Sequence, residues 1–112
     1  MDEKEIKKLI EERFGKDKIA ELQKAFNGRR LGVIVVEDKM CLLRPLTAKD
    51  LSSYSMLVMK GEEGLEQGAH YLLNNLWLAG DEEIRDDEDY FMAAMLQIQN
   101  SVELKKSAYY RV

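Results

Sequence analysis

The apolar positions in the first 28 residues follow the spacing of two short amphipathic helices. The first helix has this apolar stripe: Ile6, Leu9, Ile10 and Phe14. The second helix has a shorter one: Ile19, Leu22 and Phe26. Steps of three and four place such residues on one helix face. Gly15 is a natural stop for the first helix, and Asn27-Gly28 closes the second.

A β-hairpin is predicted over residues 31–44. Residues 31–36 are rich in β-branched side chains, which favour strands. The polar turn Glu37-Asp38-Lys39 leads into a partner strand over residues 40–44. Pro45 has no amide hydrogen to donate and should end that strand.

Helical patterns return over residues 47–104. Thr47 precedes Asp50 by three residues, which approximates a capping box for a helix that carries Leu51, Tyr54 and Val58 on one stripe. The Gly61–Gly64 segment interrupts the pattern and is predicted to be a loop. The strongest amphipathic run follows: Leu65, Ala69, Leu72, Leu73, Leu76 and Trp77. Gly80 is expected to supply a left-handed cap at its end.

The last long helix is predicted to begin at an acidic cap formed by Asp86 with Asp89. Its apolar face is Tyr90, Phe91, Ala94, Met95, Ile98 and Val102. The tail over residues 105–112 shows no clear period and is expected to fray. These patterns predict an α+β fold, in which a β-hairpin (a small antiparallel sheet) packs with four to five helices.

A length of 112 residues suits one domain over residues 1–112. Its predicted parts are a helical N-terminal segment (1–28), the hairpin (31–44), a helical region (47–104) and the tail (105–112). The longest aliphatic run, residues 33–36, is far too short to cross a bilayer. No secretory signal follows Met1, and a lone cysteine fits a reducing cytoplasm.

Charge is spread unevenly along the chain. The net charge of −4 disfavours a general nucleic-acid binder, which would show a basic face. Residues 81–89 hold seven acids and one arginine, whereas residues 1–30 hold nine basic and seven acidic residues. The two regions are therefore expected to attract one another, or to pair between copies.

The acidic segment 81–89 raises the question of a metal site. An EF-hand loop needs glycine at its sixth position and glutamate at its twelfth. Counted from Asp81, those positions hold Asp86 and Met92, so the pattern fails. The main interpretation is a solvated helix start whose acids complement the helix dipole. An acidic docking surface is the alternative.

Catalytic chemistry is not evident at the other candidate residues. His70 has Glu66 four residues before it, but no third zinc ligand follows at a familiar spacing. Cys41 lies in a predicted strand without a second cysteine, so a buried structural thiol is expected. No nucleophile elbow, phosphate-binding loop or dinucleotide fingerprint is present. No catalytic residue, metal or cofactor is predicted.

Two pairs of methionines lie at helical spacing: Met56 with Met59, and Met92 with Met95. Each pair is three residues apart and so shares a helix face. Methionine fills irregular gaps in cores, which is one interpretation. The other is an adaptable apolar surface that binds a partner helix.

Two segments resemble the small tail assembly chaperones of long-tailed phages and prophages. They are Leu42-Leu43-Arg44-Pro45-Leu46-Thr47 and Leu72-Leu73-Asn74-Asn75-Leu76-Trp77-Leu78-Ala79-Gly80-Asp81-Glu82-Glu83-Ile84. Family members have a hairpin that ends in an Arg-Pro-type turn, then a helix, then a leucine-rich helix with Trp-Leu-Gly-Gly-Asp-Glu-Glu-Ile. Ala79 replaces a frequent glycine here. The resemblance covers about residues 31–104.

The resemblance implies a non-enzymatic assembly factor in the bacterial host cytoplasm. Such proteins coat the helical tape-measure protein, keep it soluble and bring tail-tube subunits to it. Partner binding is expected at these residues: Met56, Met59, Trp77, Asp81, Glu82, Glu83, Met92 and Met95. Weak contacts repeated over many copies would supply the affinity.

Two other functions stay open from the residues alone. One is a small cytosolic adaptor or regulator that self-associates through its methionine-bearing helices. The other is a small metal-dependent enzyme that uses Asp81, Glu83 and His70. The protein sequence does not show whether a frameshift extends the C-terminus.

Overall fold

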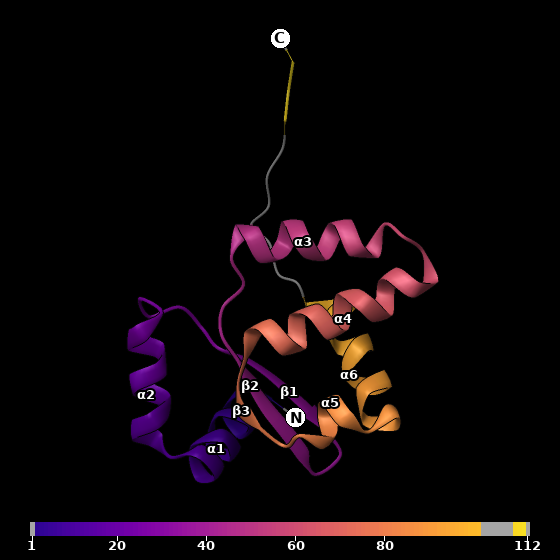
Figure 1. Cartoon of the computed structure of the whole chain (residues 1–112). Coiled ribbons are helices and arrows are strands. Elements are labelled where there is room, and N and C mark those ends of the chain that lie inside the picture. The colour runs from indigo at the N-terminus through magenta and orange to yellow at the C-terminus, as the bar shows by residue number, and fades with distance from the viewer. Residues whose placement is uncertain (1, 102–108, 112) are drawn as a thin grey trace.

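A computed structural model describes residues 2–101 and 109–111, apart from the side chains of residues 100 and 101. The elements of the described residues are α1 (Glu3–Phe14), α2 (Lys16–Ala25), β1 (Gly32–Val36), β2 (Lys39–Leu43), α3 (Ala48–Val58), α4 (Glu62–Leu76), β3 (Trp77–Gly80), α5 (Glu83–Asp86) and α6 (Glu88–Ser101). They form one small sheet packed with helices (Figure 1), so the predicted α+β fold is confirmed.

The sheet is antiparallel, with strand order β1-β2-β3. The hairpin has the predicted location, and Val36 pairs with Lys39 across a tight turn at Glu37 and Asp38. A third strand was not predicted. The chain leaves the helix at Trp77, where φ is −61° and ψ is 125°. Residues 77–80 then pair with β2, with a register irregularity between Leu42 and Leu43.

Gly80 is therefore a strand residue, and the predicted helix cap at this position is wrong. Its φ is 148°, and a Cβ here would lie 2.5 Å from the Cα of Cys41. The glycine is needed because β2 and β3 approach so closely at this pair. The helix pattern was extended too far because Trp77, Leu78 and Ala79 are all apolar, which fits a helix and a strand equally well.

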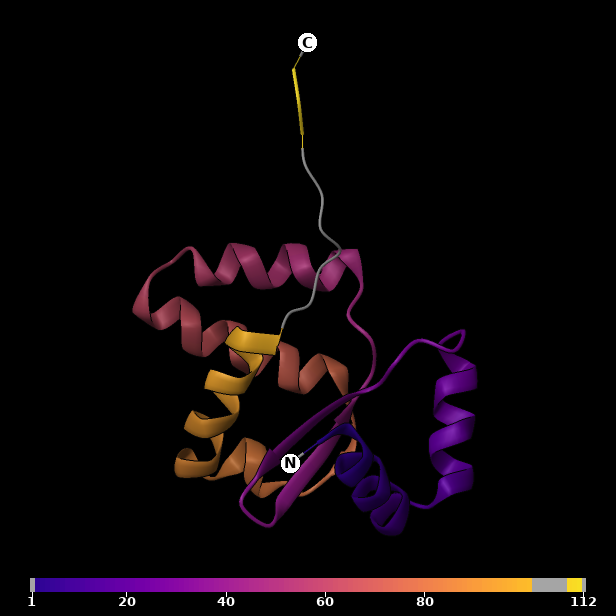
Figure 2. The same ribbon diagram turned by 180° about the vertical axis from the view of Figure 1, so that it is seen from behind.

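Alternating side chains on the strands divide the core into two layers. One face of the sheet contributes Ile34, Cys41 and Leu43 to the larger cluster, which α4, α5 and α6 complete. The other face contributes Met40 and Leu42 to a smaller cluster with α1 and α2. Figures 1 and 2 show the helices on either side of the sheet. Successive side chains of a strand point to opposite faces of the sheet, so neighbouring residues enter different clusters.

Helix α3 lies outside the larger layer and packs on α4 (Figure 1). A Cβ at Gly64 would lie 2.0 Å from the carbonyl oxygen of Leu57. A Cβ at Gly68 would lie 2.9 Å from the ring of Tyr54. The predicted loop over residues 61–64 is wrong beyond Gly61, because Glu62–Gly64 form the first turn of α4. The two helical glycines mark a close helix contact.

The starts of α3 and α6 are capped by side chains. Thr47 and Asp50 form both hydrogen bonds of a capping box at α3, as predicted. At α6 the predicted cap at Asp86 and Asp89 is wrong. The Oδ1 of Asp87 accepts from the amides of Asp89 and Tyr90, at 3.0 and 3.3 Å. Asp87 thus occupies the position where a side chain reaches the free amides of the first turn.

Several predictions concern residues outside the described range. They are Val102 on the face of α6, the end of the helical region at residues 102–104, and most of the predicted tail, residues 105–108 and 112. Residues 109–111 are described, have no regular secondary structure and expose both tyrosines.

A Gly64→Ala substitution is expected to destabilise the fold by about 2 kcal/mol, because the added methyl group overpacks the α3–α4 contact. Glycine to alanine inside a helix ordinarily stabilises by about 1 kcal/mol, so the sign of the change is diagnostic. The measurement is urea unfolding followed by circular dichroism. The control is Gln67→Ala on the exposed side of α4, expected to change stability by less than about 0.5 kcal/mol. A stabilised Gly64→Ala variant would contradict the close contact.

Candidate partner-binding surface

The outer side of α3 exposes two methionines. Met56 is 68 % exposed and Met59 is 85 % exposed. Ser52 and Ser55 are exposed on the same side, at steps of three and four residues. Gap filling in the core is therefore the wrong interpretation of Met56 and Met59. The exposed side of α3 is therefore polar at Ser52 and Ser55 and apolar at its C-terminal end.

The two methionines of α6 have different environments. Met92 is 47 % exposed, whereas Met95 is partly buried and packs against the larger core cluster. The expected shared surface of Met92 and Met95 is therefore absent, and core filling is the correct interpretation of Met95. Leu96, four residues after Met92, is 59 % exposed. Sequence analysis missed Leu96, although the step of four from Met92 was a usable signal.

Trp77 is the first residue of β3, and its side chain contacts other residues of the same chain. Its ring is half-buried and packs against the larger cluster. The guanidinium carbon of Arg85 lies 3.9 Å from the ring centroid, which is a cation–π contact. Arg85 also pairs with Glu82. Partner binding by Trp77 and Glu82 stays a prediction, and these contacts already engage both side chains.

Asp81 directly follows β3 and connects it to α1 and β2. One carboxylate oxygen pairs with Arg13 of α1. The other accepts from the amide of Met40 at 3.0 Å, and the amide of Asp81 donates to the carbonyl of Met40 at 3.0 Å. The expected attraction between the acidic segment and the basic N-terminal region thus occurs here within one chain. Glu83, at the start of α5, is exposed.

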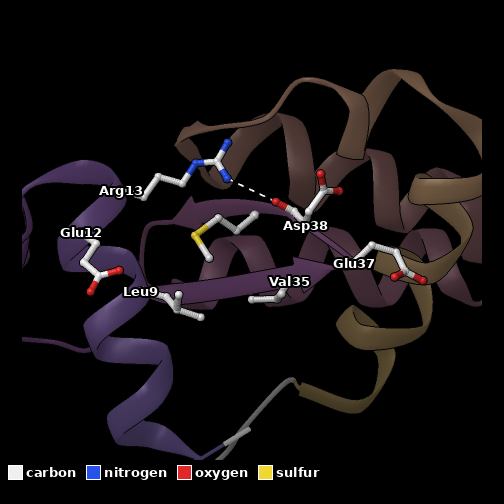
Figure 3. Close-up of a pocket in the computed structure, with 7 residues that line it drawn as sticks. Leu9, Glu12, Arg13, Val35, Glu37 and Asp38 are labelled. Atoms are coloured by element: carbon white, nitrogen blue, oxygen red, sulfur yellow. Dashed lines mark hydrogen bonds between the residues drawn. The ribbon is translucent and has the colours of Figure 1, made fainter.

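A shallow groove of about 360 Å³ lies between α1 and the hairpin (Figure 3). Leu9 and Val35 approach it from α1 and β1, and Met40 also lines it. Arg13 donates to the carbonyl oxygen of Asp38 at 3.3 Å across one side. The other lining residues are acidic: Glu12, Glu37 and Asp38. An apolar floor with an acidic rim suits a cationic side chain with an apolar stem better than an anion.

His70 and Cys41 have structural roles. The His70 ring stacks on Phe91 with 4.0 Å between centroids, and its Nε2 lies 3.8 Å from Glu66. This stack joins α4 to α6. Cys41 is fully buried, as predicted, and burial raises the pKa of its thiol to about 12. The thiol is therefore protonated and shielded at neutral pH.

No group of three His, Cys, Asp or Glu side chains is placed to hold a metal ion within residues 2–101 and 109–111, side chains 100 and 101 aside. The trio of the metal-enzyme hypothesis, Asp81, Glu83 and His70, is not gathered into such a group. Asp81 accepts from Arg13 instead, and His70 stacks on Phe91.

A buried ion pair was missed at the junction between the hairpin and α3. The guanidinium of Arg44 donates to both carboxylate oxygens of Asp50, at 2.7 and 3.1 Å. Asp50 is only 4 % exposed and also accepts from the amide and hydroxyl of Thr47. Arg44 beside it holds the pKa of Asp50 well below its usual range. The pair sets where α3 begins.

Comparisons with known proteins leave the family undecided: no family model, curated protein or solved structure matches this chain. Among the described residues, no helix has both the length and the apolar content needed to cross a membrane. The features that bear on function are therefore the exposed apolar surface of α3 and α6 and the pairing of the acidic segment.

Asp50→Asn is expected to lower the free energy of unfolding by about 3 kcal/mol. This value is at the lower end of the range for breaking a buried ion pair, because Arg44 keeps partial access to water. Urea unfolding at pH 7 measures the change. The control is Asp38→Asn, since that side chain is 79 % exposed and its Lys39 contact is 4.0 Å. A loss no larger than that of the control would contradict a structural role for the pair.

The same pair predicts a pH dependence. Because pairing lowers the pKa of Asp50 in the folded state, the unfolded chain binds the proton more readily. The stability from this group is complete above about pH 4, near the ordinary aspartate pKa, and is lost as the pH falls towards the folded-state pKa. The stability gap between wild type and Asp50→Asn should therefore shrink below about pH 4.

The Cys41 thiol is expected to react with Ellman's reagent at least about a hundredfold more slowly in the folded protein than in the chain unfolded in urea. Reaction requires opening of the sheet core, and that opening costs several kcal/mol. The absorbance of the released thiolate measures both rates. Equal rates would contradict burial of this thiol.

Proposed function

We propose that the chain is a non-enzymatic assembly chaperone that binds the tape-measure protein and tail-tube subunits in the host cytoplasm. The observation that carries the proposal is the exposed pair Met56 and Met59 on α3. Both side chains are large, apolar and turned away from the core. Methionine surfaces adapt to varied partner helices, which suits a client with a long and changing sequence.

The α6 surface supports the same role. Met92 and Leu96 are exposed on one side of the helix, while Phe91 and Ala94 are buried on the other. Two separate apolar stripes would let one copy contact a helical client at more than one place. Weak contacts of this kind gain strength when many copies bind along one partner.

The acidic segment contributes charge in this proposal. Glu83 is exposed, whereas Asp81 and Glu82 are paired within the chain. An acidic surface keeps the complex of chaperone and apolar client soluble. Tail-tube subunits are the second partner that the resemblance implies.

A self-associating adaptor is the second candidate function. The exposed charge of α3, Lys49, and that of the turn after it, Lys60, are basic, whereas those at the start of α6, Glu88 and Asp89, are acidic. This opposite charge favours contacts between copies. The two functions differ in whether a tape-measure client is held in solution.

Co-expression with the tape-measure protein of the same gene cluster tests the first proposal. We expect the soluble fraction of that protein to rise several-fold when this chain is present. The double variant Met56→Gln/Met59→Gln should lose most of the gain, because the apolar contact area on α3 is removed. Densitometry of soluble and pelleted protein on gels measures the effect.

The matched control is Leu9→Gln, which makes the same kind of change on α1, at the sheet face opposite α4. It should retain the gain in client solubility. A tape-measure protein that is equally soluble with and without this chain would refute the proposal. A full gain with the double methionine variant would remove α3 as the binding surface.

A further inference from the structure

The exposed stripes of α3 and α6 have matching spacing. The stripe of α3 consists of Ser52, Met56 and the C-cap residue Met59, at steps of four and three, and is called the α3 stripe. On α6 the stripe is Met92, Leu96 and Gln99, at the same steps. All six residues are exposed. Positions at these steps share one helix side and can pack against a similar stripe on another helix.

The order of polar and apolar residues selects one relative direction of the two helices. The apolar part of α3 is its C-terminal half, whereas the apolar part of α6 is its N-terminal half. Antiparallel packing places Met59 beside Met92, Met56 beside Leu96, and Ser52 beside Gln99. Parallel packing would instead place Ser52 beside Met92 and Met59 beside Gln99. Met56 lies beside Leu96 in both arrangements, but only the antiparallel register matches every apolar residue of the stripes with another apolar residue.

The charges at the ends of the stripes agree with the antiparallel register. Lys60 follows Met59, and Asp89 precedes Met92 by one helical turn. The register therefore brings Lys60 to Glu88 and Asp89, whose side chains are exposed. The one acid of α3, Asp50, is buried against Arg44 and does not oppose this attraction. The next acids, Glu62 and Glu63, belong to the first turn of α4, after the chain turns at Gly61.

We infer that the exposed stripe of α3 packs antiparallel on the exposed stripe of α6 in a second copy of the chain. The contact buries the four apolar side chains and pairs Lys60, in the turn after α3, with Glu88 and Asp89 at the start of α6 in the other copy. This inference does not rest on the chaperone proposal, since a chain that self-associates need not bind a tape-measure protein. The same α3 surface would serve both contacts, so client and second copy would compete for it.

The contact joins two different surfaces, so it is heterologous. After one contact, one copy keeps a free α6 stripe and the other keeps a free α3 stripe, unless a second contact between the same two copies closes the pair around a two-fold axis. A stripe this narrow gives a weak contact, so association should depend strongly on concentration. The mass measured by light scattering is expected to rise above the 13.0 kDa of one chain as concentration increases.

Charge reversal tests the inference. Lys60→Glu and Asp89→Lys should each weaken self-association about five- to tenfold, because an attractive pair becomes repulsive. The double variant Lys60→Glu/Asp89→Lys should restore it, because opposite charges again face one another between copies. Sedimentation equilibrium measures the association constants, and circular dichroism checks that each variant is folded.

Two reversals on α2 control for net charge. Lys18→Glu and Asp17→Lys change the charge by the same amounts at exposed positions away from both stripes. They should leave the association constant within about twofold of wild type, since surface charge at a distance is screened. A wild-type chain that stays monomeric up to millimolar concentration would overturn the inference. So would association that ignores the reversals, or a double variant that is not restored.

Cross-linking tests the register independently. Copies with Met59→Cys are mixed with copies carrying Met92→Cys and treated with a short bis-maleimide. The buried Cys41 should not compete. This pair should cross-link several-fold faster than Met59→Cys mixed with Gln99→Cys, which a parallel register would bring together. Equal rates, or a faster second pair, would overturn the antiparallel contact.

Discussion

The central strand β2 is the part of the structure on which the other elements depend. It pairs with β1 on one edge and β3 on the other, and its side chains enter both core clusters. Cys41 and Leu42 are fully buried on opposite faces. Hydrogen bonds at the two ends of β2 reinforce it. The amide of Arg44 donates to the carbonyl oxygen of Leu76 at 2.8 Å, and the amide of Met40 donates to the carboxylate of Asp81. A buried strand needs every backbone group paired, which explains why β3 forms.

The hairpin and the long helices could be predicted because their side-chain periods are unambiguous. Residues 33–36 are β-branched, and α1, α2, α4 and α6 carry stripes at steps of three and four. The third strand could not be predicted this way. Trp77-Leu78-Ala79 is too short and too uniformly apolar to show a period, and only the free edge of β2 decides its conformation. Gly64 was misleading for a related reason, since glycine marks both loops and close helix contacts.

The candidate site was less predictable than the fold. Spacing placed Met56 beside Met59 on one helix side, but it did not show which side faces α4. That side is decided by Gly64 and Gly68 of α4, against which α3 packs closely. The sequence pattern of α3 alone does not contain this information. The acidic segment was treated as one surface, yet Asp81 meets Arg13, whose position only the folded chain defines, and Glu82 meets Arg85 three residues later. Ion pairs between distant residues have no signature in a single sequence.

Single exposed apolar residues are common on soluble proteins and need no explanation. The exposed residues of α3 and α6 differ because they are aligned. Met56 and Met59 make no contribution to either core cluster, and neither do Met92 and Leu96. The monomer fold therefore does not require apolar side chains at these four positions. Polar substitutions at these positions should therefore test partner binding without unfolding the chain, which substitutions in β2 would not do.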